Sequence, residues 1–211
     1  MLLAGRSEEN LAALGADLGA SHVVLDARDM EAVERAVSAF APLDGLVNCA
    51  GSLILKPAHQ TSAREWQETM ETNLTTAFAT VRAGAKAMMP TGGSIVLCST
   101  AAARTGFANH EAIAAAKAGV IGLTLSAAAT YAARGIRVNC VAPGLVDTPL
   151  AARITRNEAS LKASQSMHPL GRIGRPEDVA SAIAWLVDPA NSWVTGQVLG
   201  VDGGLAALRP R

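Results

Sequence analysis

The chain has 211 residues, of which half are hydrophobic and only 3% aromatic, so it suits one domain whose strands are covered closely by helices with small side chains. Its 18 basic and 18 acidic side chains cancel, so nothing favours binding to nucleic acid or to an anionic membrane surface. No apolar run approaches the ~20 residues of a membrane-spanning helix and no signal peptide opens the chain, so we expect a soluble, cytoplasmic protein.

The first half of the chain alternates strand and helix. Ser7 is placed to start the first helix and Asp29 the second, because both are good N-cap residues. Thr61 and Ser62 are placed to cap a longer helix. The apolar periodicity predicts strands at 1–6, 22–26 and 43–48 and helices at 7–18, 29–40 and 61–88.

The second half continues the same alternation. Pro176 suits the first position of a helix, whereas in residues 149–175 the pattern loosens into short amphipathic pieces. We expect this segment, called the flap below, to be mobile. The other elements are strands at 95–98, 136–141 and 197–201 and helices at 109–133 and 176–186. Such alternation predicts the α/β class: a doubly wound parallel sheet with helices on both faces, in a single domain spanning 1–211.

Three cysteines lie late in predicted strands, at positions 49, 98 and 140. Their odd number and the lack of a Cys-x-x-Cys spacing argue against a disulfide framework or a zinc site. We interpret them as small buried side chains and expect no metal.

The stretch from Asn109 to Gly119 places one basic side chain in a helix of small residues. His110, Ile113 and Lys117 are spaced i, i+3 and i+7, so they project from one helix face. This is where we expect the chemistry.

This helix resembles that of the short-chain dehydrogenase/reductase family, NAD(P)-dependent enzymes that carry Tyr-x-x-x-Lys there. Lys117 matches the Lys, but Ile113 stands at the Tyr position. The only tyrosine, Tyr131, follows Lys117 on the same helix and cannot substitute. The resemblance therefore implies the fold and leaves the chemistry in question.

Segments along nearly the whole chain share this resemblance. Asn48-Cys49-Ala50-Gly51 matches the element beside the adenosine ribose, which implies cofactor roles for Asn48, Ala50 and Gly51. Asp26, followed by Ala27, falls where the family contacts the adenine, although an Asp that ends a strand also forms turns. Asn73 matches the Asn whose backbone holds a water in the family's proton relay. Its other interpretation is a polar residue at a helix bend.

The segment after the strand 136–141 resembles the loop that covers the nicotinamide. Pro143 and Gly144 belong to it, and the resemblance implies that the Val146 backbone and the Thr148 hydroxyl hold the carboxamide. The segment 194–204 matches the family's last strand and turn and is structural.

The start of the chain departs from this pattern. A dinucleotide fold begins with a strand, a Gly-rich turn and a helix that holds the pyrophosphate, and this chain starts inside what resembles the second strand. We expect a truncation by about one strand and helix, which would leave open strand edges, and poor dinucleotide binding by the chain as written.

Cofactor choice depends on the end of the first strand. NAD-preferring members of the family carry an acid there, whereas Arg6 offers a guanidinium suited to a 2′-phosphate. We expect NADP(H), with NAD(H) the weaker choice. The alternative is that Arg6 is a solvated residue at a helix start.

The active site lacks the usual proton donor. In the family the Tyr hydroxyl protonates the carbonyl, the Lys lowers the pKa of the phenol, and a Ser bonds the carbonyl. That Ser position falls on Thr100, with Ser99 adjacent.

His110 is the residue that could replace the missing donor. Divergent enoyl reductases of the family space their Tyr seven residues before the Lys, and the residue seven positions before Lys117 is His110. Two helical turns span about 10 Å, so His110 and Lys117 would meet across the ribose and the substrate and would not touch. Neutral imidazole can polarise a carbonyl. The alternative is that His110 caps the helix or bonds a loop.

Two functions compete for this sequence. The first is a reductase that moves hydride between NADP(H) and a carbonyl or activated C=C of a small molecule, with Asn73, Ser99 or Thr100, His110 and Lys117 in its site. The second is a non-catalytic relative that binds NADP(H) as a sensor or subunit; a non-functional fragment is a third. We favour the enzyme. The helix 109–133 resembles the family's subunit-packing helix, so we expect a homo-tetramer or homo-dimer.

Overall fold

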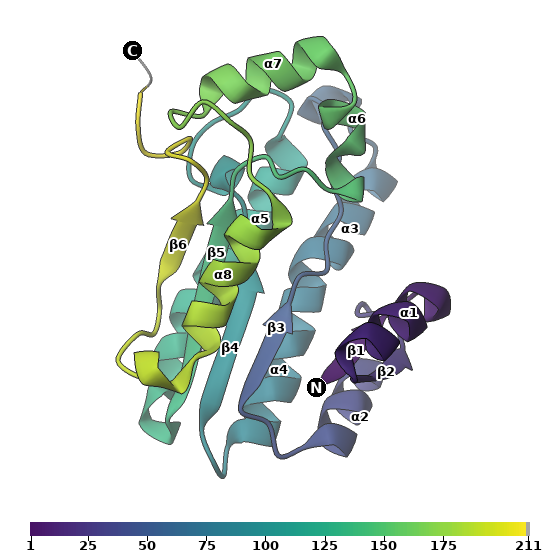
Figure 1. The fold of residues 1–211 in the computed structure, drawn as a ribbon, viewed down its shortest axis with the longest axis vertical. Helices are drawn as coiled ribbons and strands as arrows, with labels where there is room; N and C mark the ends of the chain where they lie inside the picture. The colour runs from purple at the N-terminus through teal and green to yellow at the C-terminus, as the bar shows by residue number, and fades with distance from the viewer. Residues whose placement is uncertain (210–211) are drawn as a thin grey trace.

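The computed structural model describes residues 1–209, in which six strands form two sheets, and the paired strands within each sheet run parallel (Figure 1). The last two residues of the expected domain, 210 and 211, lie outside the described part. One sheet pairs β1 (Leu2–Gly5) with β2 (Ser21–Val24). The other has the order β3 (Gly45–Asn48), β4 (Gly93–Cys98), β5 (Ile136–Pro143) and β6 (Val198–Val201).

Outside the flap the helices lie close to the predicted positions, and two short helices form within it. In chain order they are α1 (Glu8–Leu18), α2 (Met30–Phe40), α3 (Ala63–Met70), α4 (Thr76–Met88), α5 (Glu111–Tyr131), α6 (Ala152–Thr155), α7 (Glu158–Met167) and α8 (Pro176–Val187). A π-helical turn, Glu71–Thr75, joins α3 to α4. The predicted helix 61–88 is therefore three continuous pieces.

Side-chain caps explain where several helices begin. Ser7 accepts a hydrogen bond from the Asn10 amide, and Asp29 accepts from the amides of Glu31 and Ala32. At α3 the N-cap is Ser62 rather than Thr61. It forms a reciprocal capping box with Glu65.

The parallel α/β class is confirmed, but within residues 1–209 the strands form two sheets instead of one. In this described part of the chain, the edge of β1 that faces away from β2 and the edge of β3 that faces away from β4 are both unpaired. The two sheets are joined through helices, because α2 packs on α4. The contact is a cluster of small buried side chains, Val33, Val37, Ala79 and Ala83.

The larger sheet lies between helices on both faces (Figure 1). On one face α4 and α5 cover a core that includes Ile95, Leu97, Val120 and Val138. On the other face α8 covers Val96 and Val141 through Leu186, and all three are fully buried. This arrangement leaves the carboxyl ends of β3, β4 and β5 at one end of the sheet, beneath the flap.

One helical stretch corrects an expectation from the sequence. Residues Glu111–Arg134 form a helix long and apolar enough to cross a membrane by length and composition, with a mean hydropathy of 1.6 over its best window. Within the fold α5 packs against β4, β5 and α4, and 44% of that window is buried. The buried residues of α5, Val120 and Ala127 among them, belong to the core of the larger sheet.

Candidate active site

The candidate site lies where the carboxyl ends of adjacent parallel strands meet, the usual place for a ligand in such a sheet. Asn48 ends β3, Ser99 follows β4 and Pro143 ends β5. The helix α5 passes beside these strand ends and carries Lys117 into them.

Lys117 is buried, with 7% of its surface exposed. Its Nζ donates a hydrogen bond of 2.8 Å to the Cys98 carbonyl oxygen. Its own carbonyl accepts a 2.9 Å bond from Ser99 Oγ. The lysine is therefore fixed against the end of β4 at both its backbone and its amine.

Burial sets the charge state around the lysine amine. It lowers the pKa of Lys117, and the neighbouring Cys98 opposes that shift. Burial also raises the pKa of the Cys98 thiol, and it raises that of Cys140 to about 12. Both thiols are therefore neutral at pH 7 and provide no full counter-charge for the ammonium.

Asn73 meets Lys117 across a glycine. It lies in the π-helical turn, a feature that is frequent at functional sites. Its Oδ1 accepts from the Ser52 amide at 3.1 Å, and its Nδ2 donates to Ser52 Oγ at 2.9 Å. A Cβ atom built on Gly51 would lie 3.0 Å from Asn73 Oδ1 and 3.4 Å from Lys117 Nζ. Gly51 thus permits the close approach of both side chains.

The structure separates the two candidate hydroxyls. Ser99 is buried and its Oγ is committed to the backbone of α5. Thr100 Oγ1 lies 3.5 Å from the Pro143 carbonyl oxygen and accepts from the Ala102 amide. Thr100 therefore bridges the ends of β4 and β5, and it is the better of the two candidates for contact with a substrate.

At the start of α5, His110 and Ile113 have different surroundings. Ile113 is 3% exposed. His110 is partly exposed at the N-cap position, and its Nδ1 lies 2.7 Å from the Ala108 carbonyl oxygen, so Nδ1 is the donor. Its ring packs on Phe107 at a centroid distance of 5.5 Å. The loop contact named as the alternative is present, and it leaves Nε2 as the ring atom available to a ligand.

The residues expected around the adenosine form two groups. In the first group, the side chain of Asn48 bonds within the protein: its Nδ2 donates to the Thr76 carbonyl oxygen and to Thr80 Oγ1, while its Oδ1 accepts from the Ala50 amide. These bonds shape the turn that leads to Gly51.

Asp26 belongs to the second group and has a partner that the sequence reasoning missed. Its carboxylate accepts three bonds of 2.9 to 3.1 Å from the backbone and guanidinium of Arg28, together with a shorter ion pair. These bonds lower the pKa of Asp26 to about 2, and Arg6 adds to the shift. Ala27 beside it packs on the cluster between α2 and α4. An open cleft of about 530 Å³ adjoins Asp26 and Arg28.

The loop after β5 is held by local bonds. The Gly144 amide donates to the Val201 carbonyl oxygen at 3.2 Å. Thr148 Oγ1 donates to the Val146 carbonyl oxygen at 3.4 Å and accepts from the Ala151 amide at 3.4 Å. The residues expected to hold a carboxamide are thus ordered by the start of the flap.

Known proteins match this chain over nearly its whole length. A family model described as enoyl-(acyl carrier protein) reductase matches residues 2–206. The cis-4-hydroxycyclohexanecarboxylate dehydrogenase of Sinomonas cyclohexanicum is 43% identical over 178 residues, which cover 83% of this chain and 71% of that protein.

Solved structures agree with these matches. A short-chain type dehydrogenase/reductase from Mycobacterium ulcerans has a TM-score of 0.92 at 32% identity, covering 99% of this chain and 81% of that one. A variant of the actinorhodin polyketide ketoreductase with NADPH has a TM-score of 0.91 at 30% identity, covering 98% and 88%. The chain therefore belongs to the short-chain dehydrogenase/reductase family of oxidoreductases.

Proposed function

We propose that this protein is an NADP(H)-dependent oxidoreductase that transfers hydride to or from a carbonyl or an activated C=C of a small organic substrate. The observation that carries the proposal is the meeting of Lys117 Nζ, Asn73 and Gly51 at the strand ends, with Thr100 two residues beyond the end of β4. Family membership supports the same reaction class.

The residues of this chain fit a nicotinamide cofactor. A Cβ atom on Gly51 would come within 3.4 Å of Lys117 Nζ, so the glycine keeps open a space that an amine faces. In that space Lys117 would bind the ribose hydroxyls. The loop from Pro143 to Thr148 would hold the carboxamide. When bound, the nicotinamide supplies or accepts the hydride.

Charges at the end of β1 favour the phosphorylated cofactor. Arg6 is exposed there, and the nearby Asp26 carboxylate is already paired with Arg28. An acid engaged in this way is a poor acceptor for ribose hydroxyls, whereas a guanidinium binds a 2′-phosphate well. The related ketoreductase structure contains NADPH, which supports NADP(H) over NAD(H).

Proton transfer is the step for which this chain departs from its family. Ile113 has no proton to give. We assign the role to His110, whose Nδ1–H is held by the Ala108 carbonyl oxygen. Its Nε2 takes the proton of an alcohol in oxidation, and the imidazolium returns it from Nε2–H in reduction, with Thr100 binding the substrate oxygen. Lys117 positions the ribose and contributes positive charge near the reacting oxygen.

A catalytically impaired relative that binds NADP(H) is the second candidate. The buried Ile113, 3% exposed in place of a phenol, favours it. The two functions differ in turnover and share cofactor binding. A cytoplasmic location fits either.

An assay of the full-length protein separates them. NADPH oxidation is followed with small ketones, quinones and enones, and His110→Ala is compared with His59→Ala, an exposed histidine of the η1 turn (Ala58–Gln60). The enzyme proposal expects turnover that falls about 10²-fold in His110→Ala only. Cofactor binding without turnover on the whole panel would favour the sensor.

A further inference from the structure

His168 ends the last helix of the flap and is 4% exposed. Its Nδ1 lies 2.6 Å from the Ser164 carbonyl oxygen, and its Nε2 lies 3.2 Å from the Leu145 amide nitrogen. A carbonyl oxygen can only accept and an amide can only donate. The ring therefore carries its proton on Nδ1 and accepts at Nε2.

Both backbone groups of Leu145 are bound by the flap. Its N–H donates to His168, and its carbonyl oxygen accepts from the Gly174 amide at 2.8 Å. The Asp147 amide then donates to the Gly174 carbonyl oxygen at 3.0 Å. The loop after β5 is thus joined to the end of the flap by three consecutive bonds, of which only one comes from a side chain.

The imidazole is packed between backbones. A Cβ atom on Gly144 would lie 2.6 Å from His168 Nε2, closer than atoms can approach. A Cβ atom on Gly203 would lie 3.7 Å from the His168 Cβ, and the Leu170 amide donates to the Gly203 carbonyl oxygen at 3.1 Å. Gly144 therefore leaves room for this ring against the β5 loop, and Gly203 in the turn after β6 lies in ordinary contact with it.

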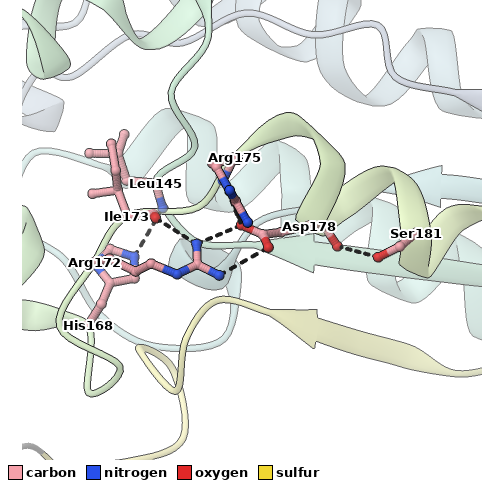
Figure 2. Close-up of polar contacts among 7 residues, drawn as sticks. All are labelled: Leu145, His168, Arg172, Ile173, Arg175, Asp178 and Ser181. Carbon is pink, nitrogen blue, oxygen red and sulfur yellow. Dashed lines mark hydrogen bonds and ion pairs between the residues drawn. The ribbon is translucent and has the colours of Figure 1, made fainter.

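A separate ion pair anchors the end of the flap to α8. Figure 2 shows Arg172 and Asp178 facing one another, with bonds of 2.7 and 3.0 Å, while the Arg175 amide donates to the same carboxylate. Among the described residues, this ion pair makes no bond to the β5 loop. The side chain that bonds to Leu145 in that loop is His168 (Figure 2). A cavity of about 460 Å³ lies between His168, Arg172 and Asp202.

We propose that His168 is a positioning residue: its neutral imidazole fixes the Leu145 amide and so holds the flap against the loop that carries Val146 and Thr148. We call the bonds from His168 to Ser164 and Leu145 the flap latch. The effect of the flap latch on cofactor binding rests on the proposed function. The effect of the flap latch on the order of the flap is independent of that function.

Two amide variants separate the two bonds of the flap latch. In His168→Gln the amide oxygen can replace Nε2 as acceptor for Leu145, whereas in His168→Asn the shorter amide can replace Nδ1 as donor to Ser164. Loss of a buried acceptor leaves an unpaired amide. We therefore expect the Leu145 amide to exchange hydrogen about tenfold faster in the Asn and Ala variants, and near the wild-type rate in the Gln variant.

Tryptic cleavage provides a second measure of the flap, because Arg153, Arg156 and Lys162 are exposed within it. Cleavage at these sites should be faster in His168→Ala and His168→Asn and near normal in His168→Gln. His59→Ala, an exposed histidine on the η1 turn, is the control and should match wild type. Equal behaviour of the Gln and Asn variants would overturn the flap latch.

Two further readouts distinguish positioning from a general loss of packing. Nitrogen-15 spectra of the His168 ring should show the Nδ1–H tautomer, and an Nε2–H tautomer would overturn the assignment. The KM for NADPH should rise in His168→Asn while kcat changes little, with rescue in His168→Gln. The exchange, cleavage and tautomer measurements need no cofactor, so their failure rejects the flap latch. An intact flap latch without NADPH binding rejects the proposed function instead.

Discussion

Ile113 is the residue at which this chain departs most from its family, and a substitution there tests the proposed chemistry. Ile113→Tyr places a phenol four residues before Lys117 on α5. A positioned general acid contributes about 10² to 10⁴ in rate, so kcat for ketone reduction should rise by at least about tenfold. The measurement is steady-state NADPH oxidation.

Ile113→Phe is the matched control, because it adds the same bulk to this buried position without the hydroxyl. A rise in both variants would show that ring size, and not proton donation, limits the reaction. A fall in both, with intact folding by circular dichroism, would mean that Ile113 is suited to a chemistry other than that of the family.

The buried ammonium of Lys117 should decrease the free energy of unfolding, although the amine has a role in the candidate site. Its pKa is lowered by burial, so at pH values between the folded value and the ordinary value of about 10.4 the unfolded state binds more protons. The free energy of unfolding therefore rises with pH in that window, by at most about 1.4 kcal/mol for each step of one in pH.

Lys117→Met fills the same space without the charge. Its urea midpoint should exceed that of wild type at pH 7, and the gap should narrow as the pH rises toward about 10.4. A lower midpoint in the variant at pH 7 would contradict this account of the buried amine.

We expect Arg6 to determine which cofactor is preferred. Arg6→Asp removes the guanidinium offered to a 2′-phosphate and supplies an acid for ribose hydroxyls. The ratio of kcat/KM for NADPH over NADH should fall at least about tenfold, because charged hydrogen bonds contribute roughly 1.5 to 3 kcal/mol. An unchanged ratio would make Arg6 a solvated residue at a helix start.

The start of α8 shows how an ion pair defines an element. The bonds from Arg172 and from the Arg175 amide hold the pKa of Asp178 well below its usual range. A carboxyl whose pKa is lowered by folding stabilises the fold at pH values above the ordinary pKa of about 3.9. This contribution is lost as the pH falls through the lowered pKa of the folded state. Asp178→Asn should therefore lower the thermal midpoint at pH 7 and lower it less at about pH 2, whereas Asp17→Asn on α1 should change neither. An equal loss at both pH values would contradict the charge argument.

The elements themselves could be predicted from the sequence, because their apolar periodicity is strong. The strand β4 (Gly93–Cys98) and the helix α8 (Pro176–Val187) lie within two residues of their expected bounds. The π-helical turn at Asn73 could not be predicted, because one wide turn changes the helical phase too little to be seen in a side-chain pattern. The open strand edges expected from the sequence are present at β1 and β3 within residues 1–209, although the pattern within each strand does not show which edges pair.

The site could be predicted only where a motif marks it. Motifs mark Lys117 and Gly51, which the structure brings together, whereas the bond from His168 to Leu145 joins residues 23 positions apart that no spacing rule connects. Arg28 gave a local signal that was missed: an Arg two residues after an Asp at a strand end can fold back on it. Of Ser99 and Thr100, only coordinates could show which hydroxyl faces β5.

Across the whole molecule, the exposed face of α5 supports the expected oligomer. Ala115, Ala118, Gly122, Leu125 and Ala129 are exposed along one strip of the helix, and Leu125 is 51% exposed. Such a strip suits close packing against another subunit. Light scattering should find a dimer or tetramer that Leu125→Glu dissociates, while Leu14→Glu on α1 leaves it intact. A monomeric wild type, or an oligomer unaffected by both changes, would contradict this use of α5.

The central claim is that the fold presents Lys117 to a nicotinamide cofactor at the ends of β3, β4 and β5. Titration of the full-length protein with NADPH, followed by nicotinamide fluorescence, tests it most directly when wild type is compared with Lys117→Met and with Lys86→Met, an exposed lysine of α4. A charged hydrogen bond contributes roughly 1.5 to 3 kcal/mol, so Lys117→Met should raise the Kd about 10- to 100-fold and Lys86→Met should leave it unchanged. Equal NADPH affinity in all three proteins would contradict the claim.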